Sequence, residues 1–163
     1  MMPLGRLTMT IKYFALATAA GAVFMSATPA LAEGCPAGKS GINLRPEVKV
    51  AAKGVTDTVL TSIDVAKEPA AISGRSFRMR RLVIQPGGIV PWHSHGERPA
   101  IIYVVQGTVT EYASTCSVPI VHKAGDATPE LHSTAHWWKN TGKGVAILLS
   151  SDLLKVGDDG KMM

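Results

Sequence analysis

The chain is poor in aromatic residues, in cysteines and in long apolar runs. Only 6% of its 163 residues are aromatic, two are cysteines and 18% carry a charge. No segment reaches the roughly 20 apolar residues that a transmembrane helix needs. No stretch keeps a helical period of apolar residues beyond two turns, which excludes a helix bundle. The sequence therefore predicts one small domain whose core is built from strands.

Positive charge is too sparse for a nucleic-acid binder. The formal net charge is +5 at pH 7, and the one local cluster is Arg75, Arg78, Arg80 and Arg81, in a segment with strand character. Because alternate residues of a strand share a face, we interpret Arg78 and Arg80 as part of a solvated strand face. We expect no nucleic-acid partner.

A basic and then apolar N-terminus predicts a cleaved secretory signal. Arg6 and Lys12 precede an uncharged run from Tyr13 to Met25, and Ala30-Leu31-Ala32 follows as a cleavage site. We expect residues 1–32 to be removed. The protein is then periplasmic or secreted, with no membrane insertion after signal cleavage.

The two cysteines, Cys35 and Cys116, are both expected in an oxidising compartment because of that signal. A disulfide between them would tie the N-terminal arm to the loop at 113–118, and two unrelated thiols are the alternative. Acylation of Cys35 as a lipoprotein fits poorly, since Glu33 stands where lipid attachment takes a small residue.

Short β-rich runs separated by turn residues predict an all-β fold. We expect an N-terminal arm over 33–54, a β-barrel over 55–155 and a loose tail over 156–163. The expected strands are Thr58–Val65, Ser76–Gln85, Ile89–His93, Ala100–Val105, Thr108–Ala113, Pro119–His122, His136–Asn140 and Gly144–Ser151. Turn residues such as Pro86-Gly87-Gly88 separate them. Many short strands in a domain of this size favour a sandwich or a small barrel.

His93 and His95, one residue apart, are the most informative pair in the sequence. On an extended strand alternate side chains point to one face, so both rings can reach one ion. Imidazole nitrogen is a good ligand for first-row transition metals, and a site needs at least one more donor. His136 is the leading candidate for that donor.

The spacing of these residues resembles the two sequence motifs of the cupin superfamily, over about a third of the chain. Residues at the expected positions of the first motif are Gly87, His93, His95 and Gly107, and those of the second are Gly125, His136 and Asn140. The sequence departs from the motifs at Ala100, where cupins hold a glutamate, and at Leu131 and Ser133, where proline and glycine are usual.

The resemblance implies a double-stranded β-helix, the cupin jelly-roll barrel, with a metal inside. Carried over to this sequence, it implies His93, His95 and His136 as metal ligands, as in three-histidine cupins that hold ferrous iron. The cofactor that we expect is a divalent transition metal, Fe(II) or Mn(II).

A dipositive ion in a barrel interior needs a compensating anion, and three acids are candidates to replace the one missing at Ala100. They are Glu97, Glu111 and Glu130. For each of them, the alternative to a role at the metal is a side chain that faces solvent. Solvent exposure weighs least for Glu111, because cupins commonly place an inward side chain at that position.

Further polar residues near the motifs have both a functional and a structural interpretation. His132 is a candidate acid or base at the barrel mouth, with a structural role as the alternative. We expect His122, beside a turn, to face water. Arg98 is a candidate clamp for a substrate carboxylate, and an exposed guanidinium is the alternative.

The sequence therefore predicts a secreted metal-binding cupin that acts on a small molecule at a mononuclear three-histidine site, by oxygenase or lyase chemistry. Its catalytic candidates are Glu111 and His132. One alternative is a non-catalytic metal- or ligand-binding cupin of the cell envelope. Another is a metal-free binder of sugars or lipid fragments, in which the histidines only form hydrogen bonds. The resemblance also implies a homodimer.

Overall fold

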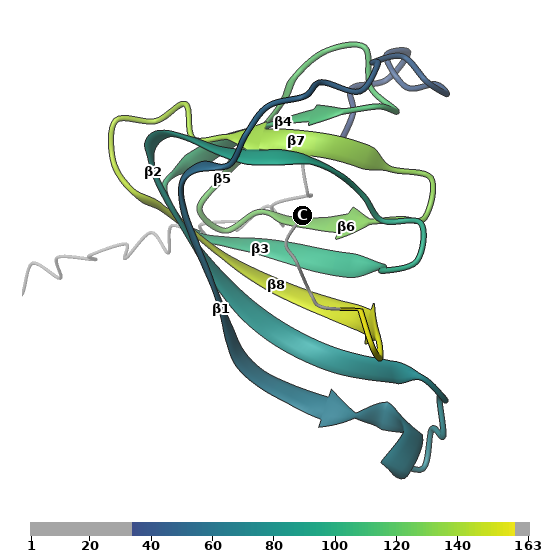
Figure 1. The fold of residues 1–163 in the computed structure, drawn as a ribbon. Coiled ribbons are helices and arrows are strands. Elements are labelled where there is room, and N and C mark those ends of the chain that lie inside the picture. The colour runs from purple at the N-terminus through teal and green to yellow at the C-terminus, as the bar shows by residue number, and fades with distance from the viewer. Residues whose placement is uncertain (1–33, 159–163) are drawn as a thin grey trace, which may run out of the picture.

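The computed structural model of the chain describes residues 34–158 and consists of antiparallel strands (Figure 1). The strands are β1 (Lys53–Asp64), β2 (Arg75–Ser94), β3 (Ala100–Gln106), β4 (Thr108–Ala113), β5 (Ile120–Lys123), β6 (Ala127–Glu130), β7 (Ala135–Lys139) and β8 (Ala146–Lys155), with one 3-10 turn, η1 (Val65–Lys67). None of the helical turns in the described part is long and apolar enough to cross a membrane. The predicted signal, residues 1–32, lies outside the described residues.

One long strand, β2, connects the two layers of the fold. Its first half, Arg75–Ile84, pairs with β8, and its second half, Ile89–Ser94, pairs with β7. The full strand order is β5-β4-β7-β2-β8-β3-β6, with β1 paired to β2. Because β2 belongs to both halves of this order, the sheet curls into a jelly-roll half-barrel (Figure 1). The all-β jelly-roll prediction is confirmed.

The predicted break at Pro86-Gly87-Gly88 is wrong, because β2 continues through it as a bend. Gly87 has a φ of 71°, a left-handed conformation that glycine adopts without strain. Across the bend the Gly87 N–H donates to the Asn140 carbonyl at 3.0 Å, and the Asn140 N–H donates to Gly88 at 2.9 Å. These bonds replace the regular ladder and keep the strand continuous.

Strand β6 is absent from the sequence prediction. It has four residues and contains Pro129, which weakens any strand signal in the sequence. The strand lies at one end of the strand order and pairs only with β3, so the missing N–H of proline leaves no central ladder bond unmade.

The N-terminal arm is fixed to the barrel by a disulfide between Cys35 and Cys116, which confirms that prediction. Two backbone bonds add to it: the Gly41 N–H donates to Thr115 at 3.0 Å and the Leu44 N–H to Ser114 at 2.8 Å. The arm therefore packs on the loop that joins β4 to β5.

The barrel interior is apolar at one end and charged at the other. The apolar end contains Leu82, Ile84, Val90, Ile102, Val104, Val109, Trp138, Ala146 and Leu148. Toward the other end of the same inward face of β2 stand Arg80 and Arg78, and across the ladder from Arg78 lies Asp152 of β8. The polar end is thus part of the interior and not of the solvated surface.

The prediction that Arg78 and Arg80 face solvent is therefore wrong. Arg78 donates to both oxygens of Asp152, at 2.9 and 2.8 Å, and Arg98 donates to one of them at 3.0 Å. Arg80 pairs with Asp57 and lies 3.2 Å from Asp152. Burial alone would raise the pKa of Asp152, but the hydrogen bond from Arg78 and the charge of Arg80 lower it. The carboxylate is therefore ionised at neutral pH.

Apolar side chains on the outer face of β2 and β3 remain exposed. They are Phe77, Met79, Ile101, Tyr103 and Val105. Apolar patches of this kind often mark protein contacts. The homodimer stays a prediction.

Replacing the buried carboxylate should destabilise the fold. In Asp152→Asn three buried guanidinium groups lose their shared anion, so we expect the free energy of unfolding to fall by about 3–5 kcal/mol, measured by urea unfolding at pH 7. The exposed Asp158→Asn is the matched control and should change by less than about 0.5 kcal/mol. Equal effects of the two substitutions would contradict the role of the ion-pair cluster.

Candidate metal centre

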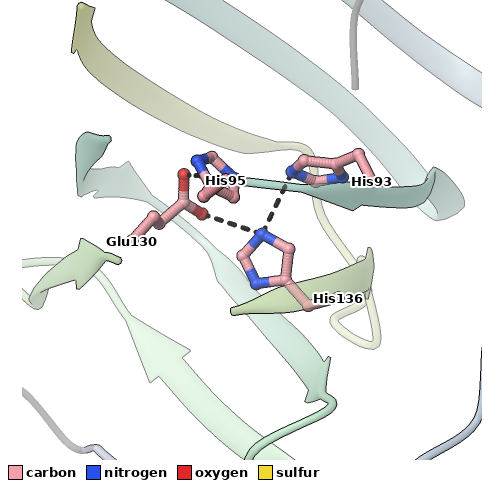
Figure 2. Close-up of side chains that lie close together, drawn as sticks. All are labelled: His93, His95, Glu130 and His136. Carbon is pink, nitrogen blue, oxygen red and sulfur yellow. Dashed lines mark hydrogen bonds and ion pairs between the residues drawn. The ribbon is translucent and has the colours of Figure 1, made fainter. Parts of the chain in front are cut away.

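Three histidine rings converge between the two layers of the barrel (Figure 2). His93 on β2 is the direct cross-strand partner of His136 on β7, and His95 follows directly after β2. The ring centroids lie 4.5 to 5.0 Å apart. His95 and His136 are fully buried, whereas His93 is half-buried and lies on the accessible side.

Hydrogen bonds fix the tautomer of each ring. The Nδ1 of His93 lies 2.9 Å from the Pro91 carbonyl, and the Nδ1 of His95 lies 2.8 Å from the Arg98 carbonyl. A carbonyl oxygen only accepts, so both Nδ1 atoms carry the proton. His136 Nδ1 likewise donates to the Glu111 carboxylate at 2.6 Å. In the neutral rings all three Nε2 atoms then present lone pairs, as metal-ligating histidines do.

Glu130 of β6 completes the cluster from the facing layer (Figure 2). Its Oε2 lies 3.0 Å from His95 Nε2, and its Oε1 lies 3.2 Å from His136 Nε2. The contact to His95 lacks the geometry of a hydrogen bond, so this buried nitrogen has no hydrogen-bond partner. His93 Nε2 lies 3.0 Å from His136 Nε2. With neutral rings, all of these inward atoms are acceptors, so either a proton or a metal ion is needed between them.

The spacing of the donors fits one metal ion. The donor atoms of His93, His95, Glu130 and His136 all lie within 4.8 Å of one another. Ligands about 2.1 Å from one ion and at right angles to each other lie about 3.0 Å apart, close to the contacts described above. Three imidazoles and a carboxylate suit a divalent transition metal.

The position of Glu130 explains the missing acid of the first motif. Ala100 of β3 is the direct ladder partner of Glu130 on β6. Directly opposed residues of an antiparallel pair lie on the same face of the sheet, with Cβ atoms about 5 Å apart. A carboxylate at 130 therefore reaches the same part of the interior that one at 100 would occupy, and the small Ala100 leaves space for it.

Glu111 lies behind His136 rather than among the converging atoms. Its Oε1 accepts from His136, and its Oε2 lies 2.9 Å from His122 Nε2. His122 is fully buried and stacks on Trp138, with ring centroids 4.8 Å apart. The prediction that His122 faces water is wrong, because the inward face of β5 carries it into the interior.

Burial and the two carboxylates set opposite protonation tendencies in the metal-free cluster. Burial alone would lower the pKa of His136, but its hydrogen bonds to Glu111 and Glu130 raise it to about 9. Burial, and then the nearby His136, hold the pKa of His93 well below its usual value of 6.5. Burial would raise the pKa of Glu111, but hydrogen bonds from His122 and His136 lower it to about 2. At neutral pH, His136 of the metal-free cluster is therefore protonated on both ring nitrogens.

The glycine and asparagine of the two motifs have structural roles that can be read directly. Gly107 has a φ of 83°, and a Cβ there would lie 2.8 Å from the Val145 carbonyl. The Asn140 side chain donates to the carbonyls of Ile84 and Gly144, at 2.8 and 2.9 Å. The family model described as "Cupin domain" matches residues 80–152, which include both positions and all four donors. The chain contains a cupin domain.

Relatives of this cupin include two curated plant proteins. The auxin-binding protein ABP19a of Prunus persica is 25% identical over 132 residues, which cover 71% of this chain and 63% of the relative. The germin-like protein 8-14 of Oryza sativa subsp. japonica is 32% identical over 82 residues, which cover 48% of this chain and 38% of the relative. The cupin thus spans less than two thirds of the length of either relative.

Among solved structures, a recombinant oxalate oxidase in complex with glycolate resembles this cupin with a TM-score of 0.48 and 23% sequence identity. The similarity covers 72% of this chain and 56% of that one.

The structure brings together the three histidines that the sequence singled out and adds Glu130 to them. Of the other acids, Glu111 is buried and accepts a hydrogen bond from His136, whereas Glu97 is exposed and pairs with Arg75. The side chain of His132 is exposed and lines a cavity of about 510 Å³, whose lining contains none of the four donors. Arg98 is buried on Asp152, so its interpretation as an exposed guanidinium is wrong. The sequence gives no signal that ranks Glu130 above the other acids, because its pairing with Ala100 appears only in the structure.

The raised pKa of His136 should be measurable in protein freed of metal by a chelator. We expect its imidazole to remain protonated at pH 7.5 and to titrate near pH 9, followed by NMR of the ring carbons. Because its folded pKa lies above 6.5, His136 contributes stability that is complete below pH 6.5 and is lost as pH rises through about 9. Glu130→Gln should lower that pKa, and a wild-type value at or below 6.5 would contradict the arrangement.

Proposed function

We propose that this protein is a secreted or periplasmic metal-dependent enzyme that acts on a small molecule at a mononuclear centre of His93, His95, His136 and Glu130. The observation that carries the proposal is the convergence of four donor atoms within 4.8 Å of one another, among them the buried His95 Nε2, which has no hydrogen-bond partner. We propose Fe(II) or Mn(II) as the ion, since both accept nitrogen and oxygen ligands together.

The chain's own residues would prepare the centre in two ways. The backbone carbonyls of Pro91 and Arg98 and the carboxylate of Glu111 hold each ring with Nε2 inward. The buried Trp138 excludes water behind the cluster. A divalent ion bound there would supply Lewis-acid or redox chemistry to a molecule that chelates it, which is why we propose oxygenase or lyase chemistry.

The charge of the interior supports a small anion as the substrate. Three buried guanidinium groups face four carboxylates, those of Asp152, Glu111, Glu130 and the partly buried Asp57, so this interior has one net negative charge. With neutral histidines, a dipositive ion makes this interior positive by one charge. An uncompensated buried charge is costly, so a bound monoanion such as a carboxylate or an enolate is favoured.

The proposed location rests on two features of the chain. The N-terminal pattern predicts a secretory signal, and the disulfide between Cys35 and Cys116 is of the kind that persists in oxidising compartments.

The metal centre can be tested by exchanging the position of its carboxylate. We expect the purified protein to bind one divalent transition ion per chain, measured by elemental analysis after loading and dialysis. Glu130→Ala should reduce affinity by at least tenfold, because the anionic donor is lost. Ala100→Glu combined with Glu130→Ala should restore part of it, since the two positions are ladder partners. A metal content near zero in the wild type after loading would refute the centre and favour a metal-free binder.

Turnover separates an enzyme from a non-catalytic binder. Protein loaded in turn with iron, manganese, copper, nickel or zinc should consume oxygen or convert a member of a panel of small carboxylic acids and diketones. His93→Ala is the matched inactive control, because it removes one donor on the accessible side. Full metal loading with no turnover across the panel would instead favour a metal-binding protein of the envelope.

A further inference from the structure

His122 is a fully buried histidine that the proposed chemistry does not use. Its ring stacks on Trp138, and its Nε2 lies 2.9 Å from Glu111 Oε2. Its Nδ1 is buried with no hydrogen-bond partner. A buried unpartnered nitrogen destabilises a fold, and a phenylalanine would fill the same space without it. The useful contact of this ring is therefore the one to Glu111.

The hydrogen bonds around Glu111 run in one direction. An ionised carboxylate only accepts, so Oε1 takes the Nδ1–H of His136 and Oε2 takes the Nε2–H of His122. The side chain of Glu111 is buried, and these two rings are its ion-pair partners. With only one donor the carboxylate could turn about its terminal bond, whereas two donors hold it in one orientation.

This support distinguishes His136 from the other two rings. His93 and His95 are oriented by backbone carbonyls two and three residues away, which the local chain conformation already fixes. His136 is oriented by a side chain 25 residues distant in sequence, and a side chain must itself be held in place.

We propose that His122 is a positioning residue of the metal centre. By donating its Nε2–H to Glu111, His122 holds that carboxylate in one orientation. The carboxylate in turn orients the His136 ring and makes its Nε2 a stronger electron-pair donor. The inference rests on the proposed metal function and extends it to a residue with no contact to the four donor atoms. Outer partners of metal-ligating histidines typically change metal affinity by 10- to 100-fold.

Cobalt(II)-loaded full-length protein provides a readout for each ring. In water, the Nδ1–H protons of the three ligands should give three shifted proton NMR resonances. His122→Phe keeps a flat ring on Trp138 and removes the donor. We expect the His136 resonance to shift or to exchange faster with solvent while those of His93 and His95 stay in place, and Co(II) affinity against a competing chelator to fall by about 10- to 100-fold.

Three variants separate positioning from packing. His122→Gln places an amide N–H near the position of Nε2 and should retain Co(II) affinity within about threefold of the wild type. Thr110 lies next to Glu111 on β4, and its hydroxyl forms a hydrogen bond with that of Thr141. Thr110→Val removes this hydrogen bond and should leave all three resonances in place. Glu111→Gln should weaken binding, and adding His122→Phe to it should cause little further loss, because both changes interrupt the same chain of bonds.

The outcomes distinguish this inference from the function on which it rests. Absence of Co(II) binding in the wild type would overturn both. Three wild-type resonances that His122→Phe leaves unchanged, together with unchanged affinity, would overturn the inference alone. Should that variant fail to fold, the ring ¹⁵N shifts of wild-type His122 decide: a proton on Nε2 is expected, and a proton on Nδ1 alone would overturn the inference.

Discussion

The centre depends on where the three ring protons are. Each Nδ1–H is donated outward, to Pro91, to Arg98 or to Glu111, so the three Nε2 atoms are turned inward. With a carboxylate among them, these converging atoms of the neutral cluster are all acceptors, which is unfavourable unless a cation lies between them. In the metal-free state one proton on His136 meets that need, consistent with its pKa of about 9. A metal would displace this proton, so binding is coupled to its release.

The ion-pair cluster and the metal centre share one rung of the sheet. Across that rung lie Arg78, Asp152, Ala100 and Glu130, in neighbouring strands. Arg98 joins the two groups a second time, since its guanidinium contacts Asp152 and its carbonyl accepts from His95. The buried charges that stabilise the barrel therefore also position one ligand. The smallest side chain of the rung, Ala100, separates the arginine-bound carboxylate from the one at the centre.

The sequence predicts the parts of the site that local chain geometry determines. Alternation along a strand places His93 and His95 together, and the cupin spacing adds His136. The sequence does not single out Glu130, because its strand is short, contains Pro129 and is recognisable only through its pairing with β3. His122, Arg78 and Arg80 were assigned to the surface because alternation reveals which residues share a face, but not which face the rest of the fold covers.

The same distances argue against a purely hydrogen-bonding role for the three rings. A sugar or lipid hydroxyl needs about 2.8 Å to each nitrogen that it contacts, and it can donate only one hydrogen. Three contacts between the inward atoms are 3.0 to 3.2 Å long, and all four atoms lie within 4.8 Å of one another, which leaves little room for an oxygen atom bonded to carbon between them. All three Nδ1 donors are already used within the protein. A small cation that accepts several lone pairs therefore suits this space better than a neutral hydroxyl, which supports the proposed metal ion.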